Sequence, residues 1–174
     1  MPADDRQRLR RLVEATCHSR RVEVTGLQHT VTSNKVTYRW SPPPTDWFKL
    51  NCDGSLFFDQ NKTGIGAILR DFYGSIIMAL SRGEEEFLEP EIVEATAVLR
   101  GLQFCLNTGI QNLMIESECF GNCKIQHCGR LSNAAAHNLA RHAWTNSQMQ
   151  LWWHFVPTFI EHVIYVDQLS CTQI

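Results

Sequence analysis

The stretch that decides the fold is residues 47–80, WFKLNCDGSLFFDQNKTGIGAILRDFYGSIIMAL. At its start, in Trp47–Cys52, apolar and polar residues alternate, which is typical of a β-strand with two different faces. The first face carries Phe48, Leu50 and Cys52, and the second carries Lys49, Asn51 and Asp53. We therefore expect a strand that buries one face and presents a polar side on the other.

Two further strands are predicted within the same stretch. Thr63–Arg70 predicts the second strand, in which Gly64 and Gly66 allow another backbone to approach closely. Ser75–Leu80 predicts the third, after the turn signal Asp71–Gly74. Because the connections are short, the three strands are expected to form an antiparallel meander.

A helix and a fourth strand are predicted next. Pro90 suits the first position of a helix, and the acids Glu89 and Glu91 suit the positive end of its dipole. Apolar residues then recur at steps of three and four through residues 92–106, which predicts one buried stripe. Residues 112–117, NLMIES, predict the fourth strand.

The C-terminal third predicts one more helix. Asn133 is the expected N-cap of a helix at residues 134–144, and the apolar stretch 156–167 is left without a type. The order of elements predicts an α/β fold. Its mixed sheet would combine an antiparallel three-strand meander with a parallel strand, and helices would pack on it.

Length and charge point to one domain with a basic arm. The chain has 174 residues, 44% of them hydrophobic, which is enough for a single core. The Pro-rich break at 41–44 predicts a boundary between an arm, 1–40, poorly ordered or a short helix, and a domain, 41–174. The arm holds 8 Lys+Arg against 4 Asp+Glu. A basic arm suggests a nucleic-acid partner, and a merely solvated tail is the alternative that stays open.

Composition also limits where the protein acts. No run of about 18 apolar residues is present, so no membrane association is expected. The start, MPADDRQRLRR, has no apolar stretch typical of a secretory signal. The seven Cys are an odd number, which favours reduced thiols. We expect a nuclear or cytoplasmic protein that is not secreted.

Three acidic residues are candidates for a metal site. Asp53 follows the first predicted strand, Glu118 follows the fourth, and Glu94 lies one turn inside the first helix. If the two strands are parallel neighbours, their carboxyl ends coincide and the three carboxylates meet. Carboxylates in one place repel each other and need a divalent cation, and oxygen ligands favour Mg²⁺ or Mn²⁺.

Five motifs, preceded by Trp40 and followed by a closing apolar block, resemble a known family. They are similar to the plant ribonuclease H-like domains, which are relatives of the ribonuclease H segment in plant non-LTR retrotransposon polyproteins. The motifs are KLNCDGS (49–55), TGIGAILRDFYG (63–74), EIVEATAVLRGLQF (91–104), LMIESEC (113–119) and GRLSNAAAHNLARHA (129–143).

The resemblance implies a ribonuclease H fold, with a five-stranded mixed sheet, helices on both faces and an acidic site at its centre. It implies Mg²⁺-dependent cleavage of the RNA strand of RNA–DNA hybrids. By motif, Asp53, Glu94 and Glu118 match the catalytic, metal-holding acids. His137 falls where well-known members carry a fourth acid, and it would orient the attacking water or shuttle its proton.

The resemblance also implies a nucleic-acid contact. The backbone at Gly54 and Ser55 would lie near the 2′-hydroxyls that distinguish RNA from DNA. The expected partner is therefore an RNA–DNA hybrid, with no dinucleotide cofactor. The oligomeric state is not predicted.

Two departures from the family pattern affect the activity. Glu118 replaces the usual Asp, and its extra methylene displaces a carboxylate whose placement is demanding. Only Cys119–Cys123 separate it from KIQHCGR (124–130), which looks like the family's fifth strand. A parallel crossover needs about a dozen residues. We therefore predict that the helices between strands four and five are missing, that the fifth strand is absent or displaced, and that the sheet edge is open.

Hybrid cleavage is accordingly expected to be weakened or lost in this internally shortened chain. A decayed element, a splice variant and a faulty gene model would each produce such a sequence. The alternative function is a non-catalytic nucleic-acid-binding or interaction module on the same fold. An unstable remnant without function is the third alternative.

Two other patterns in the sequence suggest alternative functions. Cysteine and histidine crowd at Cys119, Cys123, His127 and Cys128, but their spacing matches no compact zinc motif. The pair Trp152 and Trp153 suits either stacking on bases or packing on the last strand or helix.

Overall fold

The computed structural model describes residues 11, 39–85, 89–106, 108–118, 126–146 and 148–171. Apart from Arg11, Arg39 and Trp40, the predicted basic arm lies outside these ranges. The strands described are β1 (Phe48–Phe57), β2 (Lys62–Arg70), β3 (Ile76–Glu84), β4 (Leu113–Ser117), β5 (Gln126–His127) and β6 (Gln150–Trp153). The helices described are α2 (Pro90–Cys105), α3 (Ala134–His142), α4 (Thr158–Cys171) and a short 3-10 turn, η1 (Phe58–Gln60).

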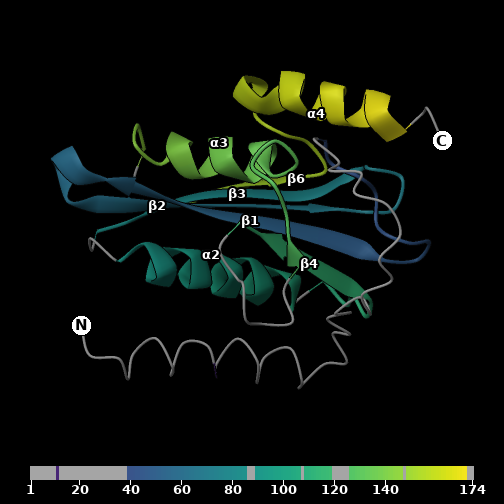
Figure 1. Cartoon of the computed structure of the whole chain (residues 1–174), viewed down its shortest axis with the longest axis horizontal. Coiled ribbons are helices and arrows are strands. Elements are labelled where there is room, and N and C mark those ends of the chain that lie inside the picture. The colour runs from purple at the N-terminus through teal and green to yellow at the C-terminus, as the bar shows by residue number, and fades with distance from the viewer. Residues whose placement is uncertain are drawn as a thin grey trace.

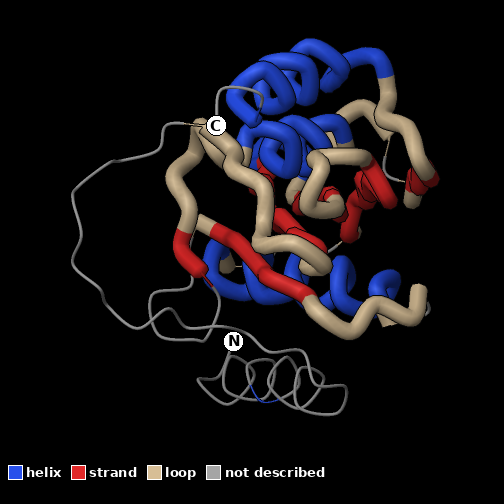
Figure 2. Tube along the Cα trace, turned by 90° about the vertical axis from the view of Figure 1, so that its right-hand side faces the viewer, coloured by secondary structure: helices blue, strands red, loops and turns tan. Residues whose placement is uncertain are grey.

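The strands form one mixed sheet in the order β5-β4-β1-β2-β3-β6. The pairs β1–β2 and β2–β3 are antiparallel, as the meander prediction requires, and β4 runs parallel to β1. Helix α2 covers one face of the sheet, and α3 and α4 lie on the other (Figure 1). The end-on view in Figure 2 shows the resulting helix–sheet–helix layers. The predicted α/β architecture is confirmed.

Each sheet face has its own hydrophobic core. The apolar face of β1, with Leu50 and Cys52, packs against the buried side of α2, including Leu102. On the other face, Ile68 of β2 packs with Leu139 of α3 and with residues of α4. The alternation of side chains along the strands therefore supplies two cores from one sheet. None of the described helices combines the length and the apolar character that crossing a bilayer needs.

Close approach of α3 to β2 depends on two glycines. A Cβ at Gly66 would lie 2.1 Å from the carbonyl oxygen of Ala136, and one at Gly64 would lie 2.2 Å from that of Ala140. Neither distance is compatible with a side chain, so both positions require glycine. The predicted role of these glycines is thus explained by the backbone of one helix resting directly on the strand.

The polar face of β1 is buried in a hydrogen-bond network. Asn51, fully buried, accepts from the Trp40 indole at 3.0 Å and donates to Glu116 Oε2 at 2.9 Å. Lys49 donates to Glu116 Oε1 at 2.6 Å and to the carbonyl of Ser41 at 2.8 Å. Trp40, just before the predicted boundary, is thereby part of the sheet structure. The bonds join β1 to β4 on the polar side.

Arg70 extends this network to the C-terminal helix. Its guanidinium donates to Asp167 Oδ2 at 2.7 Å and to Asn51 Oδ1 at 3.2 Å, and it lies 3.8 Å from the centre of the Trp40 ring. Burial raises the pKa of Asp167, while Arg70 opposes that shift. Buried charges persist only when they are paired, so Arg70 and Asp167 together fix α4 to the sheet.

The expectation that the fifth strand is absent or displaced is wrong, because a strand of two residues, β5, is present. β5 pairs in parallel with the end of β4, Glu116 opposite Gln126 and Ser117 opposite His127. At about 3.3 Å per residue, a strand of two residues spans only about 7 Å. The chain therefore needs only a short connection to return from the end of β4 to the start of β5. Among the described strands, none pairs with Leu113–Ile115 on that side, and the prediction of an open edge there stays a prediction.

Other elements differ from the sequence prediction. β1 continues to Phe57, so Asp53 lies within the strand and not after it. β6, which pairs antiparallel with β3, was not predicted, and the untyped C-terminal stretch forms α4. Trp152 packs near Phe159, with ring centres 6.4 Å apart, which agrees with the packing alternative.

We predict that Gly66→Ala lowers the free energy of unfolding by about 2 kcal/mol or more, because the α3 backbone cannot move away without losing its contacts. Gly129→Ala is the matched control, since nothing lies within 4 Å of its added Cβ. Urea unfolding of both variants measures the difference. Equal midpoints for the two variants would contradict the close packing of α3 on β2.

Candidate metal centre

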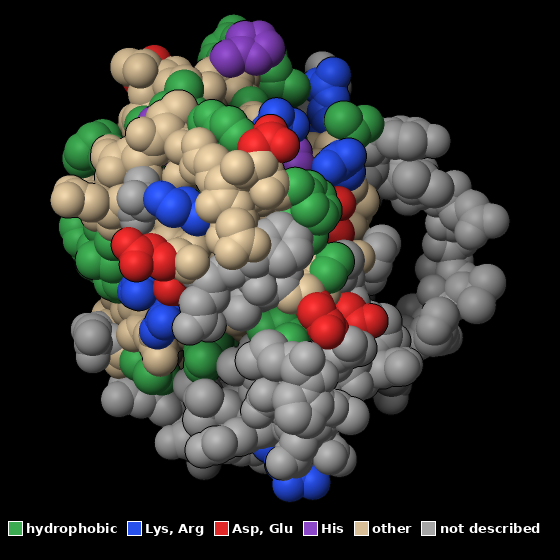
Figure 3. Space-filling view, turned by 90° about the vertical axis from the view of Figure 1, so that its left-hand side faces the viewer, with side chains coloured by type: hydrophobic (Ala, Val, Ile, Leu, Met, Phe, Trp, Pro, Cys, Tyr) green, Lys and Arg blue, Asp and Glu red, His purple; other side chains and the backbone are tan. Residues whose placement is uncertain are grey.

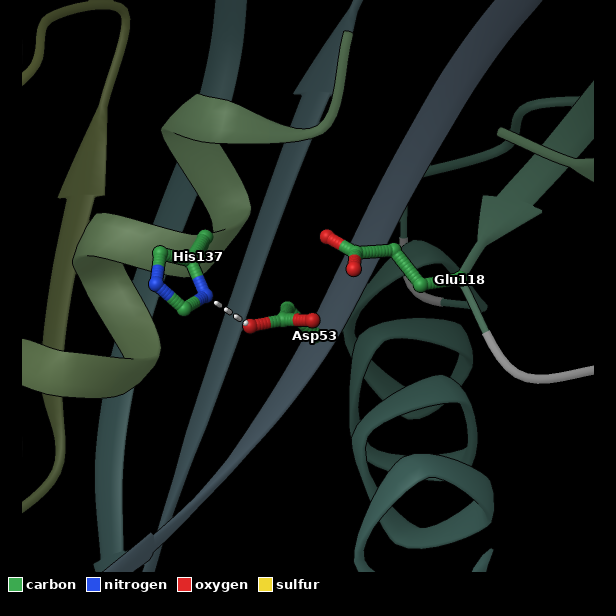
Figure 4. Close-up of side chains that lie close together, drawn as sticks. All are labelled: Asp53, Glu118 and His137. Carbon is green, nitrogen blue, oxygen red and sulfur yellow. Dashed lines mark hydrogen bonds and ion pairs between the residues drawn. The ribbon is translucent and has the colours of Figure 1, made fainter. Parts of the chain in front are cut away.

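The register of the two parallel strands positions the candidate acids. Asn51 of β1 lies opposite Glu116 of β4. Two residues further along each chain are Asp53 and Glu118, on the same face and toward the same end of the sheet. The ligand atoms of Asp53, Glu118 and His137 all lie within 4.8 Å of one another. Figure 4 shows Asp53 between the other two side chains, which approach it from opposite sides.

Asp53 and His137 are directly bonded. The distance between His137 Nδ1 and Asp53 Oδ2 is 2.8 Å, and the carboxylate is almost fully buried. In the neutral tautomer that donates from Nδ1 to this carboxylate, Nε2 is the ring nitrogen that can accept a proton. In Figure 4 the second ring nitrogen lies on the side of the ring away from Asp53.

Glu118 carries a buried carboxylate oxygen that is unpartnered in the described part of the chain. Among the described residues, Oε1 is buried and has no hydrogen-bond partner, and the same holds for Oδ1 of Asn133. Burial and then the charge of Asp53 raise the pKa of Glu118, while Arg130 and His137 lower it. An unpartnered buried carboxylate oxygen is costly unless a cation or water completes it.

Glu94 lies beside the cluster and not within the group that converges to 4.8 Å. Its Oε2 accepts a hydrogen bond from the Ser117 hydroxyl at 3.0 Å, and it is buried. Burial and then the negative charge of Asp53 raise the pKa of Glu94 to about 8. The sequence prediction that three acids meet at one point therefore corresponds here to two acids and a histidine, with Glu94 adjacent.

The donor set fits a hard divalent cation. The carboxylates of Asp53 and Glu118 stand within reach of one position, and Glu118 supplies the unsatisfied buried oxygen, Oε1. Carboxylate oxygens are the ligands that Mg²⁺ and Mn²⁺ prefer. The zinc alternative is not tested, because Cys119 and Cys123 lie outside the described residues.

Asn133 is a site residue that the sequence interpretation assigned to a different role. Its side chain makes no cap hydrogen bond at the start of α3. Instead its amide nitrogen donates to the carbonyl of Cys52 at 2.9 Å, which ties α3 to the residue before Asp53. The signal was ambiguous because Asn is common at helix starts for an unrelated reason.

A groove of about 670 Å³ adjoins the cluster at His137. Glu94 and His137 line it, and so do Gly54 and Ser55, the predicted nucleic-acid contacts. Gly54 is pressed against the start of α2, where an added Cβ would lie 2.0 Å from Cγ1 of Val93. The groove therefore brings the predicted contact residues to the same cleft as two of the candidate catalytic residues.

Comparison with protein families gives one match. Residues 51–120 fit the family model described as "Reverse transcriptase-like", a segment that includes Asp53, Glu94 and Glu118 and ends before His137. No curated protein and no solved structure matches the chain. The sheet topology defines an α/β domain, and together with the matched segment it is consistent with a ribonuclease H-like fold.

We predict that metal-free protein loses stability as the pH rises from about 4.5 to about 8, because Glu94 has a folded-state pKa of about 8 against an ordinary 4.5. The raised pKa favours the folded state while the group is protonated. That contribution is complete below the ordinary pKa and is lost as the pH passes the folded one.

The melting temperature of Glu94→Gln should fall less steeply over this pH range than that of the wild type. Glu161→Gln, at an exposed position on α4, is the matched control and should keep the wild-type slope. Identical slopes for all three proteins, measured in a chelator, would show that Glu94 does not titrate in this range.

Proposed function

We propose that residues 41–174 form a ribonuclease H-like nuclease that binds nucleic acid and cleaves the RNA strand of RNA–DNA hybrids, with Mg²⁺ or Mn²⁺ as cofactor. The observation that supports it is the convergence of Asp53, Glu118 and His137 within 4.8 Å, beside a groove that His137 lines. The reverse transcriptase-like match over residues 51–120 agrees with the same chemistry.

In this proposal Asp53 and Glu118 are the ligands that hold the cation, and Glu94 is the third acid available to it. When bound, the cation stabilises the charge that develops on the phosphate and activates the attacking water. His137, held by the hydrogen bond between Nδ1 and Asp53, would orient water or shuttle a proton through Nε2, which faces away from Asp53. Asp53 thus has two tasks, because it both binds the cation and fixes the ring of His137.

The RNA strand is recognised at the start of the groove. Gly54 and Ser55 directly follow Asp53 on β1 and line the groove, so a ribose there would meet the backbone next to the catalytic acid. Contact with a 2′-hydroxyl at this position would favour RNA over DNA. We propose that these two residues provide that contact.

The wider setting is part of the same proposal. Residues 1–40 would be a basic arm, and the protein would act in the nucleus or the cytoplasm as a relative of plant non-LTR retrotransposon ribonuclease H domains. Support comes from the charge of the arm, 8 Lys+Arg against 4 Asp+Glu, and from the odd number of Cys, seven, which favours reduced thiols.

We propose that cleavage is slow. Glu118 replaces the expected Asp, and only eight residues lie between Ser117 and Gln126, too few for the helices that would extend the hybrid-binding surface. A second candidate, a nucleic-acid-binding module without catalysis, is favoured by the bond between His137 and Asp53 Oδ2, because it occupies an oxygen that a cation would otherwise use.

We predict that Asp53→Asn reduces the rate of hybrid cleavage in Mg²⁺ or Mn²⁺ by about 100-fold or more, because it removes the charge that holds the cation. Glu161→Gln, an exposed α4 residue, is the control and should cleave like the wild type. A gel assay of a labelled RNA–DNA hybrid measures both rates.

Three outcomes separate the hypotheses. Slow wild-type cleavage that Asp53→Asn abolishes supports the nuclease. Hybrid binding without cleavage by the wild type supports the non-catalytic module. Cleavage that persists in Asp53→Asn, or a wild type that neither binds nor cleaves, rejects the proposed nuclease.

A further inference from the structure

We propose that the groove beside the acidic cluster binds the nucleotides that adjoin the cleaved phosphate, with Arg141 holding a backbone phosphate and Trp144 providing a stacking surface. This inference rests on the proposed function, since it extends the path of the same RNA strand. The residues that support it lie on the groove wall formed by α3 and its C-terminal turn.

The first support is the spacing along α3. His137, Arg141 and Trp144 follow at steps of four and three, so they lie on one side of the helix and of the turn that ends it. All three line the groove. By helical rise, Arg141 lies about 6 Å and Trp144 about 10 Å beyond His137 along the axis. A strand leaving the cluster in this direction meets first a cation and then an aromatic ring.

The second support is charge. Arg141 is exposed and lines the groove, and no acidic side chain in the described part of the chain lies within ion-pair distance of it. Arg130, also in the lining, differs because its charge already acts on Glu118 and lowers the pKa of that group. Asp59 and Glu94 are the acids of the lining, so a phosphate in the groove is placed at Arg141.

The third support is an aromatic ring held at the groove. Trp144 packs edge-on against the buried ring of Phe57, with ring centres 5.3 Å apart and an interplanar angle of 84°. It is nevertheless 42% exposed, and Phe58 on η1 is 74% exposed. A ring fixed at its edge and open to solvent is suited to stack on a base or ribose.

The surface at this end of the molecule agrees with a nucleic-acid strand as occupant. Figure 3 shows basic and acidic side chains close together there, with hydrophobic side chains among them. A cation followed by an exposed aromatic ring along a groove can hold a backbone phosphate and stack on a ribose or an unpaired base. The acidic cluster at one end explains why the strand would need a cation at that point.

The test measures binding in Mg²⁺ to an RNA–DNA hybrid by fluorescence anisotropy, on the full chain carrying Asp53→Asn so that the probe stays intact. In that background, Arg141→Gln should weaken binding about tenfold and should lower the slope of log K against log salt by about one. Arg82→Gln, on β3 and paired with Glu84, is the matched control and should change neither quantity.

Trp144→Leu should weaken binding about fivefold to tenfold without changing the salt slope, because stacking releases no counterions. Trp144→Phe should recover most of that loss, which separates stacking from a packing defect. Thermal melts of each variant confirm that the compared proteins are folded.

The outcomes test the proposed binding groove separately from the proposed nuclease activity. Equal affinity and equal salt slope for Arg141→Gln and Arg82→Gln would overturn the groove, even if Asp53-dependent cleavage is observed. Weakened binding in Arg141→Gln and Trp144→Leu with no cleavage by the chain that retains Asp53 would support the groove and reject the nuclease. A background protein that binds no hybrid would reject both.

Discussion

The buried amide of Asn51 is the interaction on which the arrangement of the sheet and site depends. It joins β1 to β4 through Glu116, to β2 through Arg70, and to the segment before β1 through Trp40. A polar group at 0% exposure must find all its partners or destabilise the fold, so these bonds select one register. Because Asn51 and Glu116 are register partners, the residues two positions beyond them face each other.

The site is therefore a consequence of strand register more than of any local motif. Asp53 and Glu118 are brought together by the parallel strands β1 and β4. The buried pair Asn51 and Glu116 lies two residues earlier along these two chain segments. α3 supplies His137 from the other side, and it does so at close range because Gly64 and Gly66 leave room for its backbone. Asn133 adds a bond from the start of α3 to β1 beside Asp53.

Sequence patterns predicted the long elements and missed the short ones for a physical reason. The alternation in Trp47–Cys52 and the apolar stripe of 92–106 each span several repeats, and β1 and α2 form there. β5 has two residues and β6 four, too few to show a period, and both exist because a neighbouring strand offers them partners. The pairing, and not the local sequence, decides such strands.

The residues of the candidate site were also only partly predictable from the sequence. The acids were predictable because they lie in motifs of known order, within or next to elements that the sequence pattern predicts. The separate position of Glu94 was not predictable, because it depends on how far α2 stands from the sheet and on the bond to Ser117. The groove lined by Arg141 and Trp144 was not predictable either, since its residues come from β1, η1, α2 and α3.

The central claim is that a divalent cation sits among the converging side chains. The most direct measurement is the anomalous diffraction signal of crystals grown with Mn²⁺, collected for the wild type and for Asp53→Asn. The account predicts a peak between the carboxylates of Asp53 and Glu118 in the wild type, and its loss in the variant. The absence of an anomalous peak from a well-ordered site at saturating Mn²⁺, or Mn²⁺ bound only elsewhere on the chain, would contradict the proposed cation site.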